Sequence, residues 1–118
     1  MSEVEMTSEE KRGKIVAEFR VLNQRVQQLR SQLLDLSGEV TEHERVLKVL
    51  EEADDDRVTY RLIGEVLAKQ GAAASRVYVA QQLDNLKKIH DQLKNQYMET
   101  MTKLVAIQKQ HNIKIVNQ

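Results

Sequence analysis

Three histidines and a short acidic stretch are the residues whose chemistry could bind a metal or catalyse a reaction. His43, His90 and His111 all occupy positions on the apolar seam of a helical pattern described below. No set of cysteines and carboxylates completes a metal site around them on one helical face. Polar residues on such a seam more often set the register and partner choice of a coiled coil, so we predict no metal site.

The acidic stretch consists of Glu51, Glu52, Asp54, Asp55 and Asp56. Such a run more often ends a helix as a solvated face than binds a metal. The sequence also lacks a catalytic set of Ser, His and Asp and a Gly-rich phosphate loop. We therefore predict that the protein is not an enzyme and needs no cofactor.

The composition is typical of long helices rather than of an aromatic-rich globule. Of the 118 residues, 41% are hydrophobic and 31% charged, but only 3% are aromatic, and Pro, Trp and Cys are absent. The 18 basic residues balance 18 acidic ones, so no net charge attracts nucleic acid or an anionic membrane. No apolar run approaches the ~20 residues of a membrane span, and the first residues lack a signal-peptide core. We expect a soluble, intracellular protein with no nucleic-acid or membrane partner.

Two segments carry the apolar repeat of a coiled coil. Apolar residues recur at alternating steps of four and three over residues 15–50 and again over residues 79–107. The pattern predicts a first helix over residues 8–54 and a second over residues 74–114. Two such helices in one short chain should pair with each other in antiparallel sense.

The register of this pairing follows from matching the seam positions of the two predicted helices. The register that we favour places Phe19 opposite Ile107 and His43 opposite Leu83. A shift by one heptad also fills the seam, so the sequence leaves both registers open.

The connector over residues 57–70 alternates in polarity instead of following heptads. Val58, Tyr60 and Leu62 point to one side, and Gly64 supplies a turn, which predicts a β-hairpin. We thus expect a mainly α fold, an antiparallel two-helix coiled coil with a central β-hairpin. A lone two-stranded hairpin is marginal in water, so other subunits should complete its sheet. The residues that we assign to this assembly are Val58, Tyr60, Leu62, Ile63, Gly64, Val66 and Leu67.

The apolar stripe broadens at both ends of the predicted coil, beyond what one partner helix can cover. Near the hairpin, Val46 and Val49 lie outside the seam. At the opposite end apolar residues of both helices gather, and methionine thioethers there suit irregular apolar partners. The residues that we expect to bind partners at this end are Ile15, Val16, Phe19, Met98, Met101, Val105, Ile113 and Ile115.

Three motifs go beyond the heptad pattern. The more specific ones are Tyr60-Arg61-Leu62-Ile63-Gly64 in the hairpin and His111-Asn112-Ile113 at the end of the second helix. The third, on the first helix, is Thr41-Glu42-His43 followed by Val46-Leu47-Lys48-Val49-Leu50. These motifs resemble the β-type subunits of prefoldin, a hexameric chaperone that delivers unfolded polypeptides to the group II chaperonin. The resemblance covers most of the chain.

The resemblance implies a single β-type domain over residues 1–118, in a complex of two α-type and four β-type subunits. The hairpins of these subunits would join in an inter-subunit β-barrel, and the coil tips would bind unfolded actin and tubulin without ATP. The sequence by itself also allows a structural or tethering coiled-coil protein that dimerises along its seam.

Overall fold

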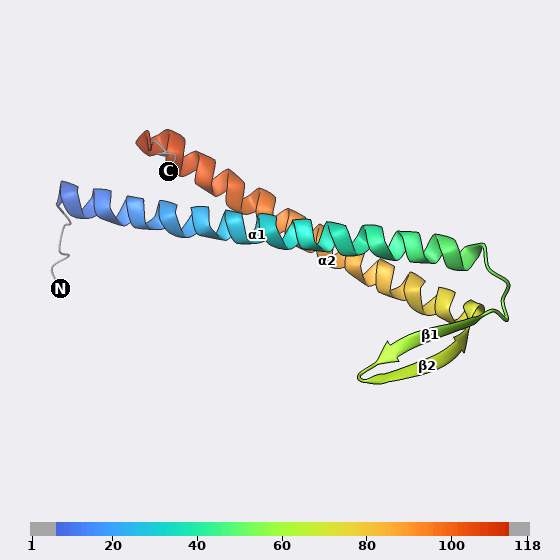
Figure 1. The fold of residues 1–118 in the computed structure, drawn as a ribbon. Coiled ribbons are helices and arrows are strands. Elements are labelled where there is room, and N and C mark those ends of the chain that lie inside the picture. Colours follow the sequence, from blue (N-terminus) through green and yellow to red (C-terminus); the bar gives the residue numbers. More distant parts are fainter. Residues whose placement is uncertain (1–6, 114–118) are drawn as a thin grey trace, which may run out of the picture. The chain divides into compact units, whose positions relative to one another are not determined.

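The computed structural model describes residues 7–113, which form two long helices and one β-hairpin (Figure 1). In chain order the elements are α1 (Ser8–Glu51), β1 (Val58–Ile63), β2 (Val66–Gly71) and α2 (Ala72–His111). The expected mainly α fold with a central antiparallel hairpin is thereby confirmed. The chain divides into two compact units, which we describe separately. They are a terminal unit, formed by the described residues within Met1–Gln32 and Leu93–Gln118, and a hairpin unit, Leu33–Gln92.

The start of α1 is set by a side-chain cap. Thr7 and Glu10 have the types and spacing of a capping box, and the Glu10 amide donates to Thr7 Oγ1 at 3.2 Å. The Lys11 amide donates to the Thr7 carbonyl at 3.0 Å, which is the first bond of the helix. Capping by a threonine satisfies a backbone donor that the helix itself leaves free.

The ends of the elements differ slightly from the spans that the sequence predicts. We expected the first helix over residues 8–54, but α1 ends at Glu51. Beyond it the backbone forms turns that are too tight to continue an α-helix. The Ala53 amide donates to the Leu50 carbonyl and the Arg57 amide to the Asp54 carbonyl. The hairpin strands span 58–63 and 66–71, against the predicted 57–70.

The second helix was predicted over 74–114 and is observed over Ala72–His111. It begins earlier because backbone bonds link it to the connector: the Ala72 amide donates to the Arg57 carbonyl at 2.8 Å and the Ala73 amide to the Asp55 carbonyl at 3.1 Å. Residue 114 lies outside the described residues.

The terminal unit has a small apolar core between α1 and α2. Phe19, Val26 and Leu104 form its buried centre, and the partly buried residues packed against it are Leu22, Tyr97, Met101, Ile107 and Ile113. Leu29 is completely buried, and burial of such a side chain contributes about 1.5–3 kcal/mol. The apolar seam that the heptads predict is therefore filled within one chain.

Polar contacts between the helices agree with the favoured register in each unit. In the terminal unit Arg30 Nη2 donates to the Tyr97 hydroxyl at 3.2 Å. In the hairpin unit Ser37 Oγ lies 3.2 Å from His90 Nε2. A shift by one heptad would place residue 37 opposite residue 96 instead, so these contacts exclude the alternative register.

The hairpin turns through two residues. Ile63 pairs with Val66 at its end and Val58 with Gly71 at its base, so Gly64 and Glu65 form the loop. Gly64 has a φ of 61°, whereas the φ of Glu65 is not positive. A positive φ at the first loop residue alone is the pattern of a type II′ turn, whose twist matches that of paired strands. Glycine adopts this conformation without strain.

Candidate functional site

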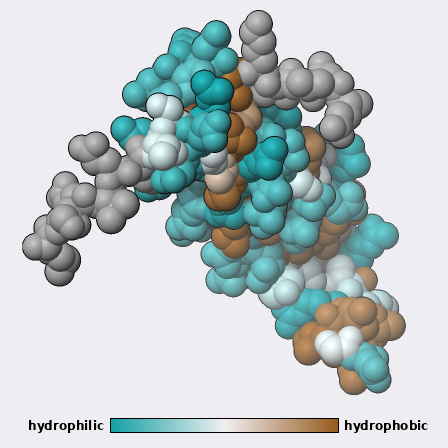
Figure 2. Space-filling model, turned by 90° about the vertical axis from the view of Figure 1, so that its left-hand side faces the viewer, coloured by the Kyte–Doolittle hydropathy of each residue, from teal (hydrophilic) through white to brown (hydrophobic). Residues whose placement is uncertain are grey.

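The outer face of the hairpin is an exposed apolar surface. Val58, Tyr60 and Leu62 of β1 are 47%, 64% and 66% exposed, and Leu67, paired with Leu62 on β2, is 65% exposed. Figure 2 shows apolar surface gathered on the hairpin at the bottom of the view. Clusters of exposed apolar side chains are typical of surfaces that contact another molecule. We call these four residues the outer face.

The remaining residues of the predicted hairpin set lie at its tip. Ile63 and Val66 flank the turn and are 52% and 67% exposed, and Gly64 forms the turn. Every member of the predicted set is thus exposed in the described chain. Both strands also have an outer edge with no neighbouring strand among the described residues, because the sheet contains β1 and β2 alone. Such edges pair readily with strands of other chains.

The inner face of the hairpin is polar and is tied to α2. Thr59 Oγ1 donates to the Gln70 carbonyl at 3.1 Å and lies 2.5 Å from Ser75 Oγ. The Arg61 guanidinium stacks on the Tyr78 ring, 4.0 Å from its centroid. Such a stack contributes roughly 0.5–1 kcal/mol at an exposed site and more where water is excluded. The inner face therefore holds the hairpin in place and leaves the outer face free.

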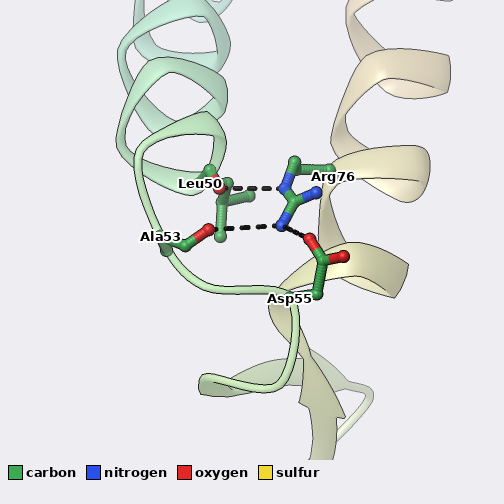
Figure 3. Close-up of polar contacts among 4 residues, drawn as sticks. All are labelled: Leu50, Ala53, Asp55 and Arg76. Carbon is green, nitrogen blue, oxygen red and sulfur yellow. Dashed lines mark hydrogen bonds and ion pairs between the residues drawn. The ribbon is translucent and has the colours of Figure 1, made fainter.

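Arg76 joins the first turns of α2 to the end of α1 (Figure 3). Its Nε donates to the Leu50 carbonyl at 2.9 Å, and its Nη2 donates to the Ala53 carbonyl at 3.3 Å and to Asp55 Oδ1 at 2.5 Å. The last carbonyls of a helix lack partners within it and carry partial negative charge. We predicted that the acidic residues at the end of the first helix form a solvated face. The structure shows that one of them, Asp55, also binds the Arg76 guanidinium.

Sequence reasoning did not single out Arg76. A signal was present, because a cation in the first turns of a helix opposes the positive end of the helix dipole. Such a residue suggests a partner outside its own helix. The partner cannot be named from the sequence, since Leu50 and Arg76 are 26 residues apart.

The end of α2 folds back through a Schellman motif. Asn112 has a φ of 51°, and the Ile113 amide donates to the Gln108 carbonyl at 3.0 Å. In this motif a residue in left-handed conformation ends the helix, and the next one returns to the apolar side. Ile113 accordingly packs against the core of the terminal unit. This geometry explains the His111-Asn112-Ile113 sequence.

A groove lies between this motif and the start of α1. Its volume is about 460 Å³. Its lining residues are Ser8, Lys11, Arg12, Ile15, Val16, His111, Asn112 and Ile113. We call it the tip groove, and Ile15, Val16 and Ile113 provide its apolar surface. A groove of this size accommodates a few side chains of a partner.

The predicted partner-binding residues of this end have different surroundings. Phe19 is only 8% exposed and lies in the core with Val26 and Leu104, and Met101 packs against that core. Met98 is 56% exposed and Val105 is half-buried, but neither lines the tip groove. Ile115 lies outside the described residues. The structure therefore brings together three residues of the predicted set in the groove and adds Lys11 and Arg12, which sequence reasoning missed.

Two of the three histidines make ordinary polar contacts. His43 Nδ1 is 2.8 Å from the Glu39 carbonyl, and His90 contacts Ser37 across the coil. Within residues 7–113 no cluster of three His, Cys, Asp or Glu side chains has the arrangement of a metal site. Neither helix, over the same residues, has a stretch both long and apolar enough to cross a membrane.

Comparison with known proteins identifies relatives over most of the chain. A family model described as Prefoldin subunit matches residues 13–118. Prefoldin subunit 2 of Homo sapiens is 27% identical over 104 residues, which are 88% of this chain and 68% of the relative. Probable prefoldin subunit 2 of Drosophila melanogaster is 30% identical over 101 residues, 86% of this chain and 71% of the relative.

A solved structure shares the fold. The prefoldin beta subunit from Thermococcus strain KS-1 superimposes with a TM-score of 0.77 and 20% sequence identity, covering 83% of this chain and 86% of that chain. The resemblance to β-type subunits, with motifs most like those of the eukaryotic subunit 2, is confirmed by these matches.

Proposed function

The chain belongs to the prefoldin subunit family, and from that premise we propose that it is a β-type subunit of the hexameric prefoldin co-chaperone. Membership implies a non-enzymatic role in protein folding and assembly with other prefoldin subunits. In the proposed complex two α-type and four β-type subunits act together in the cytoplasm. The complex binds unfolded polypeptides, actin and tubulin among them, and delivers them to the group II chaperonin without ATP.

The outer face of the hairpin supports the assembly part of the proposal. Four apolar side chains are about half to two-thirds exposed on a two-stranded sheet, a structure that is marginal by itself in water. Pairing with hairpins of other subunits in a β-barrel would cover these side chains and satisfy the strand edges. This exposed, anchored hairpin is the single observation that carries the proposal.

The tip groove supports the client-binding part. It offers apolar surface to a flexible segment but no enclosed pocket, since it is lined by one helix start and one helix end. A single contact of this kind is weak. Several tips acting on one unfolded chain bind it firmly, because each bound tip raises the local concentration of the next.

The alternative of a tethering coiled coil that dimerises along its seam is not supported. Leu29 is fully buried, and Val26 is 3% exposed beside Leu104 of the same chain. The seam that such a dimer would use is therefore occupied within one chain.

The test of the proposal is the mass of the complex that this chain forms with the other prefoldin subunits. Native mass spectrometry of the mixture should detect a hexamer that contains this chain. A stable homodimer that leaves the other subunits unbound would contradict the proposal.

A further inference from the structure

The lining of the tip groove is basic as well as apolar. Lys11, Arg12 and His111 line it, and within residues 7–113 no lining residue carries a carboxylate. Acidic and basic residues are equal in number over the whole chain, so this is a local excess of positive charge. Apolar side chains beside cations form a surface complementary to an apolar segment that carries carboxylates.

The two cations follow an acidic first turn. Lys11 and Arg12 lie directly after Glu9 and Glu10, the acidic residues of the first turn of α1. Among the described residues neither forms an ion pair with a carboxylate. No carboxylate within residues 7–113 therefore competes with a partner for these two charges.

We propose that the tip groove selects unfolded segments in which apolar side chains adjoin Asp or Glu. The apolar part of the segment packs on Ile15, Val16 and Ile113, and the carboxylates approach Lys11 and Arg12. This inference rests on the proposed function, because it names the class of client that the same groove takes. An exposed ion pair adds a modest amount, on the order of a two- to fivefold change in affinity for each charge.

The experiment measures the preference of the full-length chain between two labelled peptides. Both peptides share one apolar centre, which is flanked by Asp in one and by Lys in the other, and fluorescence anisotropy gives their affinities. The wild-type chain should bind the acidic peptide roughly tenfold more tightly, from two charges acting together. Salt should reduce this preference, since the Debye length falls from ~10 Å at 0.1 M to ~3 Å at 1 M.

Two charge-reversal variants distinguish the effect of charge at the groove from the effect of the net charge of the chain. Lys11→Glu with Arg12→Glu should abolish or invert the preference. Lys94→Glu with Lys103→Glu makes the same change in net charge at exposed positions of α2 outside the groove, and should leave the preference in place. An unchanged ratio of affinities in the first variant would overturn the inference.

A third variant distinguishes failure of this inference from failure of the proposed function. Val16→Ser with Ile113→Ser removes the apolar contacts and should weaken binding of both peptides. If it does so while charge reversal has no effect, only the charge preference is wrong. If neither variant alters binding, the client site itself lies elsewhere. Self-association of the wild-type chain that these serines abolish would assign the groove to a second copy and also overturn the inference.

Discussion

Arg76 shows how one side chain can serve a helix other than its own. It stands in α2 but binds the Leu50 carbonyl in the last turn of α1 and, just past that helix, the Ala53 carbonyl and the Asp55 carboxylate. The negative end of one helix thereby gains a cation, and three bonds stabilise the exit of the chain toward the hairpin. Its side chain is only 25% exposed, so water competes weakly for these bonds.

Replacing Arg76 by Ala should lower the free energy of unfolding by about 1–3 kcal/mol, because charge-assisted bonds to partly buried acceptors are lost. Urea denaturation of the full chain, followed by circular dichroism, measures this change. Arg20→Ala is the matched control, since Arg20 is exposed on α1, and its effect should stay within about 0.5 kcal/mol. Equal effects of the two changes would show that Arg76 does not hold the helix end.

Asn112 has a backbone conformation that few residues tolerate, with a φ of 51°. Asn112→Val should cost about 1–2 kcal/mol at this position, because a β-branched side chain clashes in the left-handed region. Asn112→Gly should be neutral or slightly stabilising. Hydrogen exchange of the Ile113 amide measures the effect, since its bond to Gln108 closes the motif. Equal protection in both variants would argue against the motif.

The hairpin is an element with two different faces. Its polar inner face is tied to α2 through Ser75 and Tyr78, whereas its apolar outer face has no partner among the described residues. The alternation of side chains along a strand produces this division directly. A change on one face can therefore affect assembly without affecting the coil.

Leu62→Asp should abolish incorporation into the complex and leave the helix content nearly unchanged, because a charge would have to be buried in the subunit interface. Size-exclusion chromatography with the other subunits and circular dichroism are the two measurements. Val21→Asp is a matched control, since Val21 is 65% exposed, almost as much as Leu62, but lies on α1 in the terminal unit. A hexamer that retains the Leu62 variant would argue against the barrel.

In the whole molecule, the surface proposed for assembly and the surface proposed for client binding belong to different units. The outer face of the hairpin lies in the hairpin unit and the tip groove in the terminal unit. Assembly through the first surface would bring several copies of the second to one client. The strength of client binding would then depend on the number of tips rather than on any one contact.

The assembled complex should therefore bind an unfolded polypeptide about 10²- to 10⁴-fold more tightly than the isolated chain. Anisotropy of a labelled, denatured client measures both affinities. The Leu62→Asp chain, left out of the complex, should show only the weak affinity of a single tip. Equal affinity of complex and single chain would contradict the multivalent mechanism.

The elements themselves could be predicted because their signals are local. The heptads between Ile15 and Leu50 determine a helix, and the alternation after Val58 determines a strand, since each pattern repeats within a few residues. The Thr7 cap and the Gly64 turn depend on single residue types with known preferences.

Contacts between distant residues could not be predicted in the same way. A heptad repeat matches itself after a shift of seven residues, so the sequence leaves the register ambiguous, and the contact between Ser37 and His90 decides it. The sequence likewise does not decide whether Phe19 is buried, because an apolar residue near a coil end can pack inside the coil or face a partner. The structure buries it beside Val26 and Leu104.

The sequence by itself thus determined two helices, a hairpin between them and the apolar character of both ends. Only the tertiary structure decided which apolar residues remain exposed, and that Arg76 caps α1 while Lys11 and Arg12 line the tip groove. The physical reason is that periodicity and turn preferences act over a few residues of one chain. Burial, register and the partners of charges depend on how distant segments pack together.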